Sequence, residues 1–258
     1  MALTLYDLSL QSRLILGTAL YHSIDEMLSC IAAAKVDMVT VGLKRELNGG
    51  KDNRFWQAIS ATGCHLLPNT AGCRTAKEAI MIANAAREIF STEYIKLEVI
   101  GDDLTLYPHG IELIKATKEL IAQGFKVLPY CPDDYIICEA LVEAGCKVLM
   151  PLASYIGSGQ GLVNMPALRL LRTRFNDITL IIDAGIGAAS DAVKAMELGF
   201  DGILLNSAVA LAQKPKQMAE AFHLAIKSGR LAYDAGVMPK RELAHHSTPL
   251  ADTPFWHQ

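Results

Sequence analysis

Short apolar runs rich in β-branched residues alternate along the chain with longer segments in which apolar residues recur at helical spacing. The first pattern is typical of buried strands and the second of amphipathic helices. Gly124, Gly145 and Gly199 each stand just before an apolar run, where the glycine that ends a helix is expected. Eight runs are predicted as strands, at residues 14–17, 38–43, 65–68, 94–99, 126–130, 147–151, 178–183 and 202–206. Helices are predicted at residues 23–34, 75–90, 110–122, 135–144, 190–198 and 215–228.

The spacing of the runs favours one closed barrel over two domains. From Leu14 to Ile203 the chain advances 189 residues over seven repeats, about 27 residues for each strand and its helix. Eight such units are typical of a (β/α)8 TIM barrel, whereas a doubly wound sheet more often has fewer strands and a G-x-G-x-x-G fingerprint after the first one. Weak alternation over residues 3–10 predicts a strand or hairpin that closes the bottom of the barrel. We therefore expect a single domain over residues 1–258, with residues 237–258 as a loop-rich C-terminal extension.

Composition and charge exclude several classes of protein. The 24 Lys and Arg residues against 27 Asp and Glu give a net charge of −3, and no basic block is longer than a pair, which disfavours nucleic-acid binding. No apolar run is long enough to span a membrane, and the first residues do not resemble a secretory signal, so we expect a soluble, cytoplasmic protein. The six cysteines lack a C-x-x-C pair and the histidines are scattered, so we expect neither a metal site nor a disulfide framework.

A lysine in the fourth predicted strand is the first candidate for chemistry, because active sites of such barrels lie at the carboxyl ends of the strands. Alternation along this strand places Lys96 and Glu98 on one face and Ile95 and Leu97 on the other. If the apolar pair faces the helices, Lys96 points into the barrel, where burial would lower its pKa and supply the neutral amine that imine formation requires. An internal ion pair of Lys96 with Glu98 or Asp183, without chemistry, explains the same pattern equally well.

Other strand ends carry groups suited to binding a phosphate. The seventh run ends in Asp183, followed by the segment Ala-Gly-Ile-Gly and a predicted helix, and the eighth ends at Asn206 and Ser207. A Gly-Ser-Gly-Gln-Gly segment at residues 157–161 follows the sixth run. Glycine loops before helices expose backbone N–H groups, and loops after the last strands of such barrels often bind phosphate.

Five further strand-end groups have weaker claims to a role. Asn69, Thr70 and Tyr130 are expected near the pocket. Cys131, at the end of the fifth run, is more typical of an inert buried thiol than of sulfur chemistry. A Lys-Arg pair at residues 44–45 could hold an anion, although a solvated loop pair is the better explanation.

Seven segments, taken together and in order, resemble thiazole synthase of bacterial thiamine biosynthesis over nearly the whole chain. Among them are the segments that hold Lys96, Glu98 and Asp183. They lie at residues 66–72, 95–98, 127–131, 150–152, 156–162, 183–187 and 195–199.

The resemblance implies a reaction and a set of site residues. Lys96 would form a Schiff base with the ketone of 1-deoxy-D-xylulose 5-phosphate, with Glu98 and Asp183 as acid/base carboxylates. Sulfur would come from the thiocarboxylated C-terminus of a sulfur carrier protein, not from Cys131, and the product would condense with dehydroglycine made by another enzyme. No cofactor is implied, and a homo-oligomer, a dimer or a tetramer, is expected. The positions that match the family's substrate-binding residues are Gly157, Ala184, Gly185, Asn206 and Ser207.

The chain also departs from the family's usual residues in three loops, at residues 19–20, 153–155 and 188–189, while it keeps the three catalytic residues. Two other functions fit the pattern of residues. One is a lysine-imine aldolase or isomerase that acts on another phosphosugar without a carrier protein. The other is a non-catalytic phosphosugar-binding subunit. The sequence assigns no role to the C-terminal extension, which could cover the pocket or contact a partner.

Overall fold

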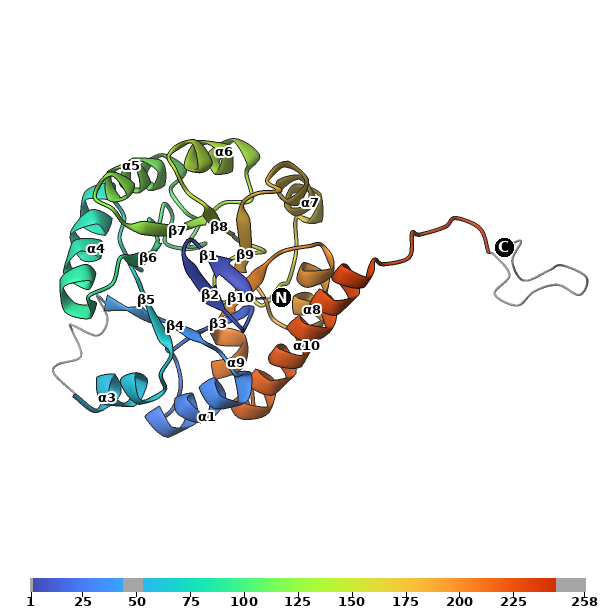
Figure 1. The fold of residues 1–258 in the computed structure, drawn as a ribbon, viewed down its shortest axis with the longest axis horizontal. Helices are drawn as coiled ribbons and strands as arrows, with labels where there is room; N and C mark the ends of the chain where they lie inside the picture. The colour runs from blue at the N-terminus through green and yellow to red at the C-terminus, as the bar shows by residue number, and fades with distance from the viewer. Residues whose placement is uncertain (1, 44–52, 245–258) are drawn as a thin grey trace, which may run out of the picture.

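The computed structural model describes residues 2–43 and 53–244, which contain a closed barrel of eight parallel strands surrounded by helices (Figure 1). The strands follow one another around the barrel in sequence order, and the last pairs with the first. They coincide with the eight predicted apolar runs, so the TIM-barrel prediction is confirmed. The strands are β3 (Leu14–Gly17), β4 (Met38–Gly42), β5 (His65–Asn69), β6 (Tyr94–Leu97), β7 (Lys126–Cys131), β8 (Val148–Pro151), β9 (Thr179–Asp183) and β10 (Gly202–Leu205).

Each predicted helix is present, and besides the four-residue helix α9 (Ser207–Ala210) two longer helices appear that the sequence pattern does not predict. One of these, α7, carries three arginines and buries only Leu168 and Leu171, which weakens its apolar period. The other, α3, buries only Ile59 among its residues 54–61. The helices are α1 (Ile24–Ala34), α3 (Asn53–Ala61), α4 (Ala76–Phe90), α5 (Gly110–Ala122), α6 (Tyr135–Glu143), α7 (Met165–Arg174), α8 (Ala189–Glu197), α9 (Ser207–Ala210) and α10 (Pro215–Ala235).

Helix α10 runs past its predicted end at residue 228 because a glycine inside it serves packing. A Cβ on Gly229 would lie 2.6 Å from the carbonyl oxygen of Val193 in α8, so only glycine allows this close approach. The helix then continues to Ala235.

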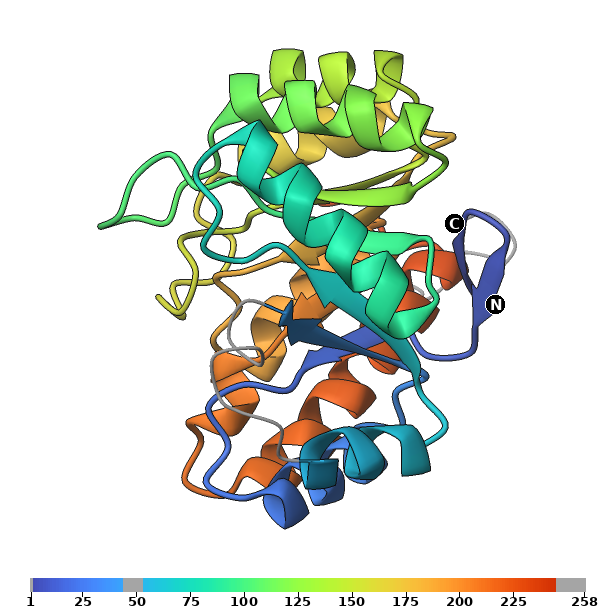
Figure 2. The same ribbon diagram turned by 90° about the vertical axis from the view of Figure 1, so that its left-hand side faces the viewer.

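The interior of the barrel is closed at one end by the predicted hairpin, β1 (Leu3–Leu5) and β2 (Leu8–Leu10). Leu3, Leu5 and Leu10 are buried in one cluster with inward-facing strand residues such as Ile181. The Tyr6 hydroxyl donates a hydrogen bond to the carbonyl oxygen of Val127, at the start of β7. Figure 2 shows the hairpin at one end of the barrel and the long loops at the other. The hairpin prediction is confirmed.

The end of the described chain carries no helix or strand. Residues 237–244 are exposed and run away from the barrel (Figure 1). Residues 245–258 of the predicted extension lie outside the described residues, and so does a role for them at the pocket. The single-domain organisation stays a prediction. Within the described part of the chain, no helix is both long and apolar enough to cross a membrane.

Candidate active site

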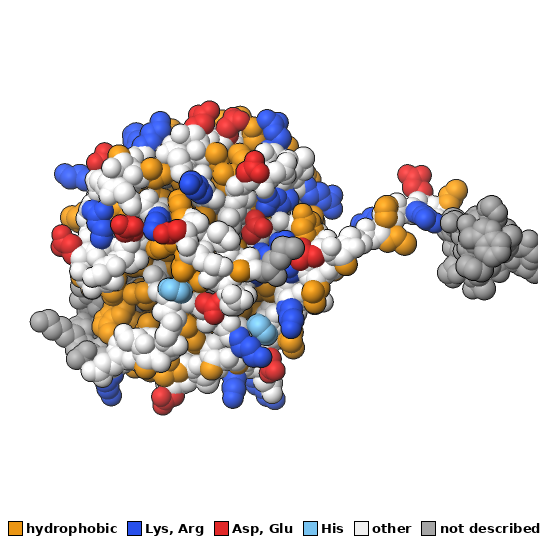
Figure 3. Space-filling model, in the orientation of Figure 1, with side chains coloured by type: hydrophobic (Ala, Val, Ile, Leu, Met, Phe, Trp, Pro, Cys, Tyr) orange, Lys and Arg blue, Asp and Glu red, His pale blue; other side chains and the backbone are white. Residues whose placement is uncertain are grey.

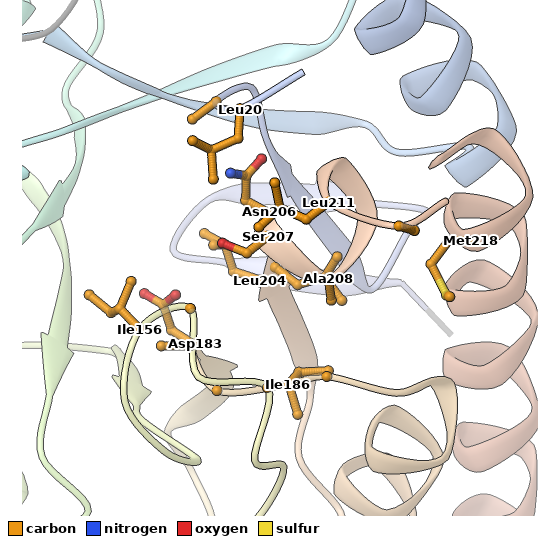
Figure 4. Close-up of a pocket in the computed structure, with 18 of the residues that line it drawn as sticks. Leu20, Ile156, Asp183, Ile186, Leu204, Asn206, Ser207, Ala208, Leu211 and Met218 are labelled. Atoms are coloured by element: carbon orange, nitrogen blue, oxygen red, sulfur yellow. The ribbon is translucent and has the colours of Figure 1, made fainter. Parts of the chain in front are cut away.

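A cavity of about 760 Å³ lies at the carboxyl ends of the strands, opposite the hairpin. Its walls come from the loops after β3, β8, β9 and β10, together with α9 and the start of α10. Figure 4 shows Asp183 and Ile156 on one side of the cavity, Leu211 and Met218 on the other, and Ser207 between them. The structure places every predicted catalytic and substrate-binding residue in this lining: Lys96, Glu98, Gly157, Asp183, Ala184, Gly185, Asn206 and Ser207.

The Lys96 ammonium lies between two carboxylates on the floor of this cavity. Its Nζ is 2.7 Å from Asp183 Oδ2 and 3.1 Å from Glu98 Oε1, and the three side chains are 8%, 4% and 7% exposed, respectively. Ile95 and Leu97 pack in the core between strands and helices, so alternation does turn Lys96 into the barrel. Both ion pairs that the sequence offered as alternatives therefore form at once.

The charge state of Lys96 differs from the sequence-based expectation. Burial alone would lower the pKa of Lys96, but the charges of Asp183 and Glu98 and the hydrogen bonds to them outweigh burial and raise it above its ordinary value. The expected lowering was wrong because the sequence did not reveal that both carboxylates contact the amine. Lys96 is an ammonium in this arrangement and needs a proton acceptor before it can act as a nucleophile.

Asp183 is suited to be that acceptor. Burial raises the pKa of Asp183 to about 6, with Lys96 acting against the shift and the negative charge of Glu98 adding to it. Because Asp183 is hydrogen-bonded to Lys96 and titrates near neutral pH, a proton can pass between the two groups at small cost.

Thr70 fixes the backbone of Glu98 where strand pairing ends. Strands β5 and β6 pair at Asn69 and Lys96, and beyond this point the Thr70 hydroxyl takes the place of a strand neighbour. It accepts a hydrogen bond from the Glu98 N–H (2.7 Å) and donates one to the Glu98 carbonyl oxygen (2.8 Å). Thr70 is fully buried and contacts the Glu98 backbone. The sequence placed it near the pocket but did not reveal this support.

A left-handed turn directs the chain away from Asp183 at the end of β9. Ala184 has φ of 75° and Gly185 of 81°, and a left-handed alanine costs roughly 1 kcal/mol. A Cβ on Gly185 would clash with backbone atoms of Ser154, so the loops after β8 and β9 meet at backbone level. The Ser154 hydroxyl donates a hydrogen bond to the Gly185 carbonyl oxygen (3.2 Å). These contacts hold the carboxylate of Asp183 in place.

The glycine loops meet at the cavity, but one predicted anion site is already filled. A Cβ on Gly157 would lie 3.9 Å from Ser207 Oγ, so the loops after β8 and β10 face each other there. The Asp191 side chain accepts hydrogen bonds from the N–H groups of Gly187 (3.2 Å) and Ala188 (2.9 Å). The start of α8 therefore carries its own carboxylate, and the expectation of open N–H groups at Gly187 was wrong.

The sequence missed the apolar side of the cavity. Leu20, Leu211 and Met218 line it, and no motif marks them because each comes from a different segment. The sequence placed Tyr130 at the pocket without a role, and its buried ring lies 5.9 Å from Lys96 Nζ. These groups surround the charged floor with apolar surface, which strengthens its electrostatic interactions.

One other strand-end candidate does not join the site, and another falls outside the described residues. Cys131 is buried in the core outside the barrel, 3.7 Å from Cys138 between sulfur atoms, and burial raises its thiol pKa, so it is an inert thiol. Lys44 and Arg45 lie outside the described residues. Among the residues that the structure describes, no cluster of three or more His, Cys, Asp and Glu side chains could hold a metal.

Comparison with known proteins gives consistent matches over the whole barrel. A family model described as "Thiazole biosynthesis protein ThiG" matches residues 4–249. A thiazole synthase of Coxiella burnetii (strain Dugway 5J108-111) is 53% identical over 246 residues, 95% of each chain. A thiazole synthase of Rhodopseudomonas palustris (strain BisA53) is 52% identical over 253 residues, 98% of this chain and 97% of the relative. Among solved structures, the crystal structure of the Amycolatopsis orientalis BexX/CysO complex contains a chain that is 30% identical, with a TM-score of 0.83 over 93% of this chain and 98% of that chain.

Proposed function

This chain belongs to the thiazole synthase family, whose members act in thiamine thiazole biosynthesis, and from that premise we propose that it works through an imine between Lys96 and 1-deoxy-D-xylulose 5-phosphate. The observation that carries the proposal is the buried cluster on the cavity floor. There the amine lies within 2.7 Å of one carboxylate and 3.1 Å of another. An amine of this kind forms covalent adducts with ketones once it has lost its proton.

The first step uses the contact between Lys96 and Asp183. Asp183 Oδ2 accepts a proton from Nζ, and the neutral amine attacks the ketone carbon of the sugar. The resulting carbinolamine loses water when Asp183 or Glu98 returns a proton to the leaving hydroxyl, which gives the imine. The rise of the Asp183 pKa to about 6 supports this role, because the group can both take and return a proton near neutral pH.

The second step moves the carbonyl along the sugar. We propose that one carboxylate removes a proton from the carbon next to the imine to give an amino-enol. The former imine carbon then takes up a proton from a carboxyl group while the enol hydroxyl loses its proton, which leaves a new ketone beside an amine. Glu98 and Asp183 both lie within 3.1 Å of the same Nζ, so either carboxylate is near a carbon attached to the imine. The hydrogen bonds between Thr70 and the Glu98 backbone keep the Glu98 carboxylate in position for this proton transfer.

The phosphate of the sugar fits the wall formed by the loops after β8, β9 and β10. Gly157 and Gly185 adopt left-handed conformations, with φ of 74° and 81°, and Gly157 is exposed. Ser207 adds a hydroxyl at the start of the short helix α9. A short extra helix after the eighth strand is a recurrent part of phosphate sites in TIM barrels. We propose that Gly157, Ala184, Gly185, Asn206 and Ser207 hold the substrate here.

Sulfur is proposed to arrive on a protein. The similar A. orientalis chain BexX was crystallised in a complex with CysO, which supports a protein partner for this chain as well. We propose that the partner is a sulfur carrier whose C-terminal thiocarboxylate reaches the imine, so that the chain acts as a sulfur-incorporating transferase. Dehydroglycine from a second enzyme then completes the ring. We also propose a homo-oligomer, a dimer or a tetramer, which light scattering coupled to size-exclusion chromatography tests.

Reconstitution tests the proposed function. Purified protein with 1-deoxy-D-xylulose 5-phosphate, thiocarboxylated carrier and dehydroglycine should form thiazole phosphate, detected by mass spectrometry. Lys96→Arg, which keeps a cation between the carboxylates but forms no imine, should form none. Lys115→Arg is the matched control at an exposed position and should retain activity. Conversion of the sugar to another product without carrier would instead support the aldolase or isomerase function.

A further inference from the structure

A second cavity of about 310 Å³ lies at the opposite end of the barrel, between the start of β3 and helix α10. Figure 3, viewed from this end, shows Lys, Arg and His side chains over the lower part of α10. Its volume is at the lower limit of small-molecule sites, roughly 300–1,000 Å³. The polar side chains that line it include those of Ser12, Arg13, His223, Lys227, Arg230 and Asp234.

Arg230 has a donor atom without a hydrogen-bond acceptor beside this cavity. Its Nε binds Asp234 Oδ1 at 2.9 Å, but its Nη1 lies 3.6 Å from Asp201 Oδ1, beyond hydrogen-bond distance. This Nη1 is buried and makes no hydrogen bond within the described residues. Asp201 is also shared, because its Oδ2 pairs with Arg172 at 2.9 Å. A buried guanidinium nitrogen without an acceptor is costly, so an acceptor supplied by a ligand would be favourable.

Positive charge exceeds negative charge around this cavity. Burial and the neighbouring charge of Arg230 lower the pKa of Arg13, and Asp201 and Asp234 only partly oppose this. Lys227 makes no ion pair in the part of the chain that the structure describes. Burial and the charges of Lys35 and Lys227 lower the pKa of His223, which reports a positive local potential. An anion in the cavity would relieve this repulsion.

We propose that this second cavity binds the phosphate group of a small phosphorylated molecule, with the Arg230 guanidinium and the Lys227 ammonium as its principal donors. A phosphate oxygen suits both donors, because charge-assisted hydrogen bonds from Arg and Lys to phosphate are short and strong. The Ser12 hydroxyl on the β3 side already donates to the Leu14 carbonyl oxygen (3.3 Å), so the two cations carry the site. The site goes beyond the proposed function, because it lies at the end of the barrel away from Lys96.

Site-resolved NMR titration at constant ionic strength tests the proposal, since general charge screening is then held fixed. Inorganic phosphate and ribose 5-phosphate are the two probes. Saturable shifts are expected in the Ser12 and Arg13 amides and in the His223 ring. Tighter binding of the sugar phosphate would identify a phosphate monoester as the ligand, and equal binding would identify free phosphate.

Variants on two helices give the decisive comparison. Lys227→Gln should raise the dissociation constant at this cavity about tenfold, the loss expected for one charge-assisted contact. Lys118→Gln makes the same charge change at an exposed position of α5 and should leave it unchanged. Both side chains are exposed, and the unaffected amide spectrum of each variant will show that the fold is kept. Shifts confined to Gly157 and Gly185, or equal affinities of the two variants, would overturn the proposal.

Discussion

Replacing Lys96 with methionine leaves two carboxylates side by side on the floor of the cavity without the ammonium that separates them. Glu98 and Asp183 are only 7% and 4% exposed, so water cannot replace the lost charge. Removing one partner of a buried ion pair costs about 3–5 kcal/mol of the free energy of unfolding. We expect a loss of this size at alkaline pH, even though methionine fills most of the volume of lysine.

The loss should shrink as the pH falls, because Asp183 can take up a proton. Its pKa in the folded protein, already about 6 against 3.8 in the unfolded chain, rises further in the variant once the opposing effect of Lys96 is gone. A raised carboxyl pKa contributes stability that is present below the unfolded value and lost as the pH rises through the folded value. The free energy of unfolding of the variant therefore keeps falling with pH up to a higher pH than that of the wild type. Each unit by which the pKa of Asp183 rises in the variant adds about 1.4 kcal/mol to the loss.

Urea unfolding of both proteins at about pH 5 and about pH 8 measures this difference. The free energies of unfolding should nearly agree at the lower pH and differ by about 3 kcal/mol or more at the higher pH. The double variant Lys96→Met/Asp183→Asn should recover much of the loss. Lys115→Met is the control, because Lys115 is 62% exposed and pairs with Glu112 at the surface, so it should change stability by less than about 0.5 kcal/mol. An equal effect of Lys96→Met at both pH values would refute the reasoning.

Three further predictions concern activity. Thr70→Val should lower kcat by about tenfold with little change in KM, because it removes both hydrogen bonds to the Glu98 backbone. Thr70→Ser should restore kcat, and equal rates for the two variants would rule out a positioning role. The rate of the wild type should rise with pH through an apparent pKa near 6 as Asp183 ionises, and the residual rate of Asp183→Asn should lack this step; a retained step would assign it to another group. Gly185→Ala should raise KM for the sugar phosphate about tenfold or more, because its Cβ would meet Ser154 and displace the loop; unchanged KM would place the phosphate elsewhere.

The direction of Lys96 was predictable because it depends on a local property of the chain. Strand alternation has a period of two, so Ile95 and Leu97 in the outer core determine that Lys96 faces inward. Gly157 and Gly185 were predictable in the same way, because tight turns at strand ends favour glycine, which adopts positive φ without steric cost. The barrel and the polar part of the cavity lining both follow from such local signals, whereas its apolar side does not.

The charge state of Lys96 was not predictable in this way. It depends on contacts between β6 and the ends of other elements, which sequence spacing does not report. The support of Glu98 by Thr70 likewise appears only where β5 and β6 stop pairing. Helix α7 escaped detection because Arg172 lies on its inner side and pairs with Asp201, which interrupts the apolar pattern.

Borohydride trapping tests the central claim, covalent catalysis by Lys96, most directly. Wild-type protein incubated with 1-deoxy-D-xylulose 5-phosphate and then reduced should gain the mass of the reduced sugar adduct, and peptide mass spectrometry should place it on Lys96. Lys96→Arg should gain none, whereas Lys115→Arg should be labelled like the wild type. Folded wild-type protein that gains no adduct, or an adduct on another lysine that persists in Lys96→Arg, would contradict the account.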